Sequence, residues 1–219
     1  MITRIIGICK IFYENSKITR DFSRGNQWYN KENHRLQSIK DKQGIVQLTS
    51  GQICLLRKRN HILRDCLNKT THYMIQHCLK HGIGKIVVGH NKGWKNKSKM
   101  GKKSNQRFVQ IPHSLLMNKI ESMCERYGIQ FTRQEESYTS RSSFLDNDPI
   151  PVYGIPLKKK VIFSGRRIAR GLYQTKGAQL INADMNGAAN ILRKCTHTSA
   201  LAGKVAKGLL AVPVRIRFD

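Results

Sequence analysis

The stretch INADMNGAANILRK, from Ile181 to Lys194, decides which fold we expect for this chain. Small residues follow its single carboxylate, and they predict a helix from Met185 to Lys194 with Asp184 at its start. Taken locally, Asp184 is an N-cap whose carboxylate accepts backbone N–H groups of the first turn. Any further role depends on what the rest of the chain contains.

The charge balance indicates the kind of partner. The 219 residues include 40 Lys and Arg against 13 Asp and Glu, a formal net charge of +27 at pH 7. This excess is far more than solubility requires, so we expect a polyanionic partner. No run approaches the roughly 20 apolar residues of a membrane-spanning helix. The opening MITRIIGICKIFYENSK has too short an apolar stretch for a secretory signal. We expect a cytoplasmic protein without a membrane partner.

The cysteines are not spaced as in a typical metal-binding site. No two of them form a C-x-x-C pair, and structural zinc sites normally use such closely spaced pairs. In a chain without an export signal we expect reduced thiols in the core rather than disulfides, and no zinc. The six residues are Cys9, Cys54, Cys66, Cys78, Cys124 and Cys195.

Two helices are expected in the first part of the chain. Asn26 to Lys40 is a polar segment with helical character, and from Gln52 to Leu79 apolar residues recur at helical spacing. Thr49 or Ser50 can cap the longer helix, and Gly82 follows its end. Its other face is basic, which fits either a solvated face or a ridge that contacts phosphates. The cations of that face are Arg57, Lys58, Arg59, Arg64 and Lys69.

The middle of the chain has an α/β order. Lys85 to Asn91 is a β-branched run typical of a buried strand. A helix is predicted from Pro112 to Gly128, with an apolar stripe, and Ile129 and Phe131 begin a second strand. A mixed or parallel sheet flanked by helices follows from this order. The stripe of the helix comprises Leu115, Leu116, Ile120, Met123, Cys124 and Tyr127.

A basic loop is expected between the first strand and this helix. The segment from Lys92 to Arg107 is rich in Lys, Gly, Asn and Ser and contains no acidic residue. Cations beside a ring that can stack are typical of sites for single-stranded or distorted nucleic acid. Trp94 fits this role or that of a core anchor. The candidate binding residues are Lys92, Trp94, Lys95, Lys97, Lys99, Lys102, Lys103 and Arg107.

Several segments together resemble a known family. In order and spacing they are similar to the C-terminal half of the OrfB/TnpB proteins of bacterial insertion sequences, which are RNA-guided DNA endonucleases with a RuvC-like, RNase H-type domain. The resemblance extends from about Asn26 to Lys194, and SYTS and the last motif are its specific parts. The segments are KIVVGHNKGWK, SNQRFVQIP, QEESYTSRSSFLDNDPIPVYG, FSGRRIARGLY and INADMNGAANILRK.

The resemblance implies a catalytic role for Asp184. RNase H-type nucleases hold two Mg²⁺ ions about 4 Å apart on a cluster of carboxylates, and Mg²⁺ prefers oxygen ligands. By position, Asp184 corresponds to the last catalytic aspartate of the family, and Asn186 and Asn190 belong to the same motif. Mg²⁺ is therefore the expected cofactor of any activity that this chain retains.

The other two catalytic acids depart from the family pattern. Gly89 stands where the family has its middle glutamate, and Glu135 or Glu136, after the neighbouring strand, is a substitute. Strand alternation puts these two on opposite faces, so one at most points at the metals. We prefer Glu136, which with Asp184 makes up the expected metal ligands. The first aspartate has no counterpart, because Cys9 follows Gly7 and Ile8 in the nearest string.

Two further parts of the family pattern are missing. The large N-terminal half that grips guide RNA and target is absent, and SRSSFLD stands where the family has a cysteine pair of its zinc ribbon. Asp146 and Asp148 of this region fit a turn before proline. The chain therefore resembles a truncated or decayed copy, in which the loss of one carboxylate impairs two-metal cleavage.

The sequence thus predicts an incomplete RNase H-like (RuvC-like) α/β domain over residues 1–195, with a mixed sheet flanked by helices, and a tail over 196–219. Arg166, Arg167 and Arg170 are additional nucleic-acid-binding candidates. The expected partners are DNA and guide RNA rather than a small-molecule substrate, and the expected location is the bacterial nucleoid. The alternative is a non-catalytic basic RNA- or DNA-binding or regulatory protein with the same fold.

Overall fold

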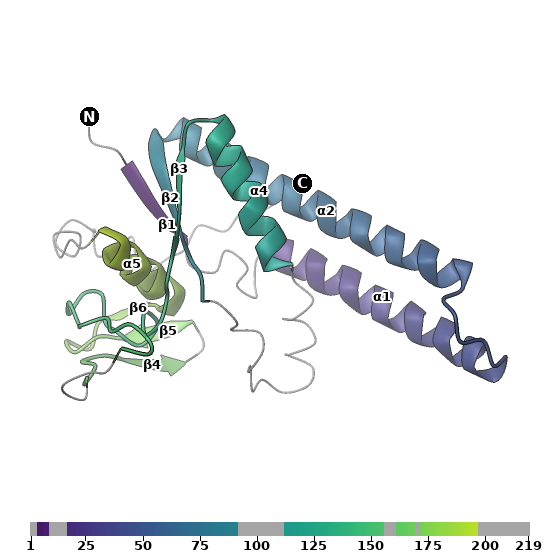
Figure 1. Cartoon of the computed structure of the whole chain (residues 1–219). Coiled ribbons are helices and arrows are strands. Elements are labelled where there is room, and N and C mark those ends of the chain that lie inside the picture. The colour runs from purple at the N-terminus through teal and green to yellow at the C-terminus, as the bar shows by residue number, and fades with distance from the viewer. Residues whose placement is uncertain (1–3, 9–16, 92–111, 156–160, 170, 197–219) are drawn as a thin grey trace. The chain divides into compact units, whose positions relative to one another are not determined.

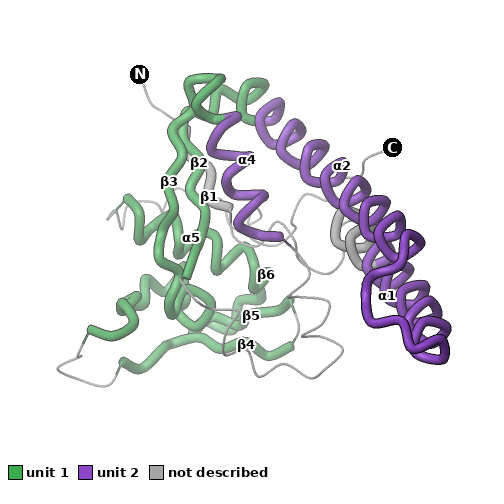
Figure 2. Tube along the Cα trace, turned by 45° about the vertical axis from the view of Figure 1, so that its right-hand side comes forward, with its two compact units in different colours: residues 1–11, 78–94, 124–215 green, residues 12–77, 95–123, 216–219 purple. Residues whose placement is uncertain are grey.

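A computed structural model describes residues 4–8, 17–91, 112–155, 161–169 and 171–196 (Figure 1). The chain divides into two compact units (Figure 2). We call residues 1–11, 78–94 and 124–215 the sheet unit and residues 12–77, 95–123 and 216–219 the helical unit. The predicted basic loop, with Trp94, and the predicted tail from residue 197 on lie outside the described residues.

Two long helices dominate the helical unit (Figure 1). The first, α1 (Lys17–Lys42), contains the predicted polar helix, and the second, α2 (Ser50–Lys80), confirms the predicted amphipathic one. The Oγ1 atom of Thr49 accepts the N–H of Gln52 at 3.3 Å, and Oε1 of Gln52 accepts the N–H of Thr49 at 3.2 Å. This reciprocal capping box makes Thr49 the N-cap of α2.

Helix α4 (His113–Arg126) begins in the helical unit and confirms the predicted third helix. Leu116 and Ile120 of its predicted stripe are buried, as are Leu67 and Ile75 of α2. The stripe was too wide, because Leu115 and Tyr127 are exposed. Leu115 lies at the border of the apolar arc, where helical periodicity alone does not separate a buried residue from an exposed one, and Tyr127 follows the last residue of α4, Arg126.

A parallel sheet forms the centre of the sheet unit. Its strands are β1 (Arg4–Ile8), β2 (Ile83–Gly89) and β3 (Gln130–Gln134), in the order β1-β2-β3. Ile86 and Val87 of the central strand are fully buried, which explains its β-branched run. Because all three strands run in the same direction, their carboxyl ends meet at one edge of the sheet.

A second, antiparallel sheet was not predicted from the sequence. It consists of β4 (Arg166–Ala169), β5 (Leu172–Gln174) and β6 (Leu180–Asn182), in the order β4-β5-β6. The helix α5 (Ala183–Thr196) follows directly. Phe144, Tyr173, Ile181 and Ala183 form a buried cluster between these elements. The strands have only three or four residues each, too few for an alternating pattern to stand out.

The mixed α/β class is confirmed, with helices and two small sheets. The prediction of core thiols holds for Cys78 and Cys124, which are buried, but it was wrong for Cys54, which is exposed. None of the five described cysteines forms a disulfide with another described residue. None of the described helices is both long and apolar enough to cross a lipid bilayer.

Candidate functional site

The start of α5 is capped by a different residue from the one predicted. Oδ1 of Asn182 accepts the backbone N–H groups of Asp184 at 3.0 Å and of Met185 at 3.1 Å. Asn182 is therefore the N-cap, and the expectation that Asp184 caps the helix was wrong. Asp184 lies half-buried in the first turn, where its charge also suits the positive end of the helix dipole.

One side of α5 contacts the loop that carries the SYTS motif. Asn186, Asn190 and Arg193 follow one another at helical spacing, and the first two are completely buried. Asn186 accepts the N–H of Phe144 at 2.9 Å and donates to the carbonyl of Ser142 at 2.9 Å. These bonds explain why the motif requires amides at buried positions, since buried backbone groups need partners.

The neighbouring bonds extend this contact along the same loop. Asn190 donates to the carbonyls of Thr139 at 2.9 Å and Ser142 at 2.7 Å. Arg193 donates to Oδ1 of Asn147 at 2.7 Å and to the carbonyl of Asp148. Burial lowers the pKa of Arg193, although the nearby Asp148 counteracts this. The loop from residue 139 to 148 is therefore fixed to α5 by side chains of a single helix face.

The opposite side of α5 faces the parallel sheet. Ile191 is completely buried, and a Cβ atom added to Gly89 would lie 2.5 Å from its Cδ1 atom. Asp184 precedes Ile191 by seven residues, or two helical turns, so the two lie on nearly the same side of α5. The helix thus carries Asp184 on its sheet-facing side and the amides on the other.

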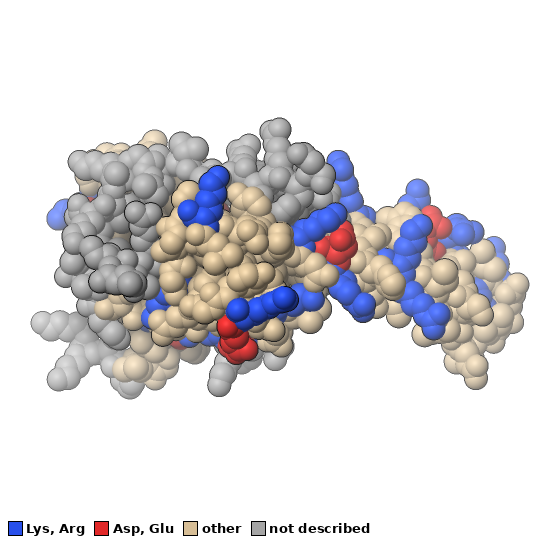
Figure 3. Space-filling view, turned by 90° about the horizontal axis from the view of Figure 1, so that it is seen from above, with Lys and Arg blue, Asp and Glu red and all other residues tan. Residues whose placement is uncertain are grey.

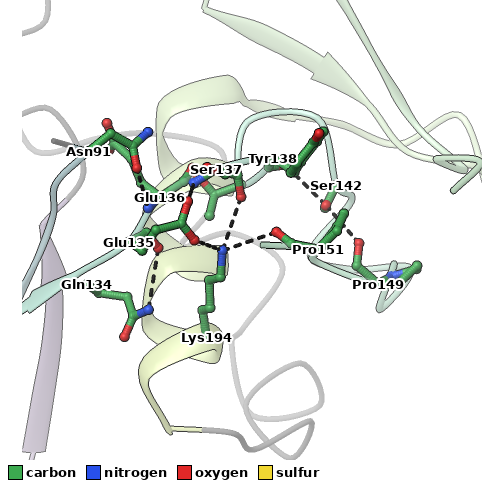
Figure 4. Close-up of polar contacts among 11 residues, drawn as sticks. Asn91, Gln134, Glu135, Glu136, Ser137, Tyr138, Ser142, Pro149, Pro151 and Lys194 are labelled. Carbon is green, nitrogen blue, oxygen red and sulfur yellow. Dashed lines mark hydrogen bonds and ion pairs between the residues drawn. The ribbon is translucent and has the colours of Figure 1, made fainter. Parts of the chain in front are cut away.

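Glu136 occupies the space that Gly89 leaves open. A Cβ atom at residue 89 would lie 2.5 Å from Oε2 of Glu136 and 3.2 Å from its Cβ. The backbone N–H of Glu136 donates to Oδ1 of Asn91 at 3.1 Å, a contact that ties the end of β3 to the end of β2 (Figure 4). The carboxylate therefore lies beside the last residue of the central strand, where the resemblance implies a glutamate.

Glu135 has a different environment. Lys194 of α5 forms an ion pair with its carboxylate and donates to the carbonyls of Ser137 at 3.4 Å and Pro151 at 3.2 Å (Figure 4). Partial burial raises the pKa of Glu135, but hydrogen bonds from Lys194 and Ser137, with the lysine's charge, outweigh it and hold the pKa below its usual value. Glu135 is thus bound to Lys194, whereas Glu136 is the one of the two glutamates that lies beside Gly89.

The described carboxylates fall short of a two-metal centre. No three His, Cys, Asp or Glu side chains in the described ranges come together in a group that could hold a metal ion. Asp184 and Glu136 supply the oxygen chemistry that Mg²⁺ prefers, but a pair of ions requires a larger cluster of carboxylates. Cys9, where the family has its first aspartate, lies outside the described residues. The residues that the structure describes do not fit two Mg²⁺ ions.

The basic face of α2 separates into two groups of cations. Lys58 lies over the ring of Trp28 and Arg59 over that of Tyr29, each 5.2 Å from the centroid, and Lys69 pairs with Asp65 at 2.9 Å. These three stabilise the helical unit itself. Arg57 and Arg64 are exposed and have no interaction with another described residue.

Basic side chains are spread along the visible face of α1 and α2, with few acidic ones between them (Figure 3). In the sheet unit, Arg166 and Arg167 are exposed on β4, an edge strand. Arg170 and the basic loop candidates from Lys92 to Arg107 lie outside the described residues. The surface cations that remain unneutralised are therefore found in both units.

Asn91 and Lys194 were not among the site residues predicted from the sequence. Asn91 comes after His90, the residue that follows β2, and a polar residue after a strand of a parallel sheet is a recognised signal for a site. Lys194 closes the last motif, but only the fold brings it to Glu135, 59 residues earlier in the sequence. The first contact could have been anticipated and the second could not.

A protein-family model matches part of this chain. Residues 9–95 match the family model OrfB_IS605, described as "Probable transposase". This match confirms the resemblance to the OrfB/TnpB family. It includes α1, α2 and β2, whereas Glu136 and Asp184 lie beyond the matched range. A search of curated proteins found no match to this OrfB-like chain.

Two solved structures that resemble this chain are, by their titles, complexes with sgRNA and DNA. One is the crystal structure of the AacC2c1–sgRNA–extended non-target DNA ternary complex, with a TM-score of 0.55 and 12% identity over 80% of this chain. This chain spans 22% of that protein's length. Another is the cryo-EM structure of the Cas12f1–sgRNA–target DNA complex, with a TM-score of 0.47, 19% identity, and coverage of 74% of this chain and 40% of that one.

Proposed function

We propose that this chain is a transposon-associated nucleic-acid-binding protein of the TnpB type, with DNA and guide RNA as its partners and with impaired two-metal cleavage. Its fold is interpreted as RNase H-like. The parallel sheet β1-β2-β3, with α5 packed against it, supports this interpretation. The family match and the similarity to an RNA-guided nuclease fold are the reasons to look for nucleic acid rather than for another polyanion.

The unneutralised arginines are the observation that carries the proposal. Arg57 and Arg64 are seven residues apart on α2 and therefore lie on one side of the helix, about 10.5 Å apart along its axis. Because Lys58, Arg59 and Lys69 have partners within the helical unit, the exposed pair has its charge available for phosphate groups. The same holds for Arg166 and Arg167 on the edge strand β4.

Impaired cleavage follows from the carboxylates. Glu136 replaces the missing side chain of Gly89, and Asp184 lies on the sheet-facing side of α5, but within the described ranges no third carboxylate joins them. Asp184 and Glu136 are the two residues that we assign to a single Mg²⁺ ion, should one bind. Two-metal hydrolysis needs a second ion, for which these ligands are insufficient.

Salt-dependent binding tests the first half of the proposal. Affinity for labelled single-stranded RNA and for duplex DNA is measured against salt concentration, where log K should fall linearly with log salt. Each phosphate contact that is lost reduces the slope by about 0.7–0.9, so the Arg57→Ala/Arg64→Ala variant should reduce it by about 1.4–1.8. Arg35→Ala is the matched control, because Arg35 is paired with Glu32 at 3.0 Å. Equal slopes for both variants would show that this face of α2 does not contact the nucleic acid.

Cleavage of a target plasmid tests the second half. The chain and its Asp184→Ala variant are incubated with Mg²⁺, guide RNA and target, and the strands are examined on a gel. We expect no cutting above background from either protein. Robust cutting that is lost in Asp184→Ala would refute the impaired site and leave the binding function intact.

A second candidate is a non-catalytic binder that retains the fold for a regulatory role. The ion pair between Lys194 and Glu135 favours it, because it commits one of the two neighbouring glutamates to the fold. This candidate predicts the same salt-dependent affinity with no change on addition of Mg²⁺. Metal-enhanced affinity that disappears in Asp184→Ala would exclude it in favour of the impaired nuclease.

A further inference from the structure

Asp146 links two distant segments of the sheet unit. Its Oδ2 atom accepts the hydroxyl of Ser143 at 2.5 Å and the backbone N–H of Lys176 at 2.9 Å, and its own N–H donates to Oγ of Ser143 at 3.3 Å. The turn around Ser143 is therefore closed on itself and at the same time fixed to a segment 30 residues later.

Asp148 makes a second link of the same kind. Although 93% of this residue is buried, both of its carboxylate oxygens are bonded. Oδ2 accepts the backbone N–H groups of Ser143 at 2.8 Å and Ser164 at 3.0 Å, and Oδ1 accepts the hydroxyl of Ser164 at 2.7 Å. A buried carboxylate with three donors has hydrogen-bond partners in place of water and fixes the geometry of its neighbours.

The two links occupy the region where the resemblance implies a zinc ribbon. Ser143 and Asp146 have the spacing of a C-x-x-C pair, but neither is a thiolate or an imidazole, the ligands that structural zinc requires. The described residues contain no cluster of three His, Cys, Asp or Glu in this region or elsewhere that could hold a metal. The residues present do not fit zinc.

We propose that Asp146 and Asp148 take the structural role of a metal ion. Their carboxylate hydrogen bonds hold the loop from residue 139 to 148 and the β4-β5-β6 sheet together without zinc. A structural metal ion joins two segments of chain by binding ligands from each. Here each carboxylate accepts hydrogen bonds from Ser143 of the loop and from a second segment, at Lys176 for Asp146 and at Ser164 for Asp148. The comparison with a zinc ribbon rests on the proposed TnpB-type function, whereas the hydrogen-bonded link itself stands on the distances.

The link has a consequence for the candidate site. The loop that it stabilises is the same loop whose backbone binds Asn186, Asn190 and Arg193 of α5. Loosening the loop would therefore loosen the helix that carries Asp184. Tyr173 supports the arrangement by donating to the carbonyl of Arg141 at 2.8 Å.

Most of the polar and charged groups around Asp146 and Asp148 interact favourably with these two carboxylates. Lys176 and Ser143 face Asp146, Arg193 lies near Asp148, and both carboxylates lie near the Tyr173 hydroxyl. Burial, together with these carboxylates, raises the pKa of Tyr173 to about 12, so its hydroxyl remains a donor at physiological pH. Burial also raises the pKa of Asp146, but hydrogen bonds from Ser143, Lys176 and Ser164 outweigh this and hold it below its usual value.

The test is thermal unfolding of the full chain at neutral pH, with and without a chelator and with added Zn²⁺, alongside metal analysis of the purified protein. We expect no bound zinc and the same midpoint in all three conditions. Asp148→Asn and Asp146→Asn should each lower the midpoint by roughly 3–12 °C, the loss expected for hydrogen bonds to a charged group. Asp65→Asn is the matched control, since Asp65 is exposed and pairs with the likewise exposed Lys69 at 2.9 Å.

Ser164→Ala removes one donor to Asp148 without changing a charge, so it keeps the test decisive if the aspartate variants fail to fold. We expect a smaller decrease of its midpoint in the same direction. Stoichiometric zinc whose removal unfolds the protein would overturn the inference, as would aspartate and serine variants that melt like the control. Nucleic-acid binding measured on the same samples separates this outcome from a failure of the proposed function.

Discussion

Replacing Gly89 by alanine tests the placement of Glu136. The added Cβ would lie 2.5 Å from Oε2 of Glu136 and 2.5 Å from Cδ1 of Ile191. The carboxylate is the end of a flexible side chain and can turn away, but Ile191 is fully buried and cannot. Such overpacking costs about 1–3 kcal/mol. The Gly89→Ala variant should therefore unfold at a lower urea concentration than the wild type.

A double-mutant cycle separates the two contacts. If the cost arises partly from Glu136, the Gly89→Ala/Glu136→Ala double variant should be more stable than the sum of the single effects by about 0.5–1.5 kcal/mol. Gly177→Ala is the control in the same unit, because nothing lies within 4 Å of a Cβ added there. Unfolding of Gly89→Ala at the wild-type midpoint, or additive single effects, would refute the placement of the Glu136 carboxylate beside Gly89.

Three more predictions follow from the contacts of α5 and its loop. Asn190→Ala should destabilise the protein by about 1–3 kcal/mol, because the carbonyl of Thr139 loses its amide donor, and urea unfolding checks this. Lys194→Met should raise the pKa of Glu135, which loses its ion pair, and an NMR titration of that carboxyl measures the change. Because the folded pKa values of Glu135 and Asp146 are depressed, their stabilisation is complete above roughly pH 5 and is lost as the pH falls below about 4; unfolding midpoints should therefore decrease as the pH is lowered below about 4, and less so in Glu135→Gln.

The long elements could be predicted from the sequence because each repeats its pattern several times. Helix α2 shows its apolar residues over eight turns, and Thr49 and Gln52 mark its start. The strand β2 has a β-branched run that fits only a buried strand. The short strands β4, β5 and β6 offered no such repetition, and β1, with five residues, was not separable from its mixed surroundings.

Within the candidate site, the sequence indicated which residues matter but not their hydrogen-bond and ion-pair partners. Strand alternation indicated that at most one of Glu135 and Glu136 points at the metals, and the preference for Glu136 stays a prediction. In the structure Lys194 forms an ion pair with Glu135, and Glu136 lies beside Gly89. The capping assignment failed because Asn182 and Asp184 are both good N-cap residues, and the helix begins at Ala183 rather than at the predicted Met185. The links of Asp146 and Asp148 join segments 16 to 30 residues apart, which no local pattern encodes.

The most direct test of the account measures the affinity of the purified chain for single-stranded RNA and duplex DNA over a range of salt concentrations, with and without Mg²⁺. We expect a steep linear fall of log K with log salt, no effect of Mg²⁺ on that slope, and intact strands throughout. Affinity that does not depend on salt, or strands that are cut only while Asp184 is present, would contradict it.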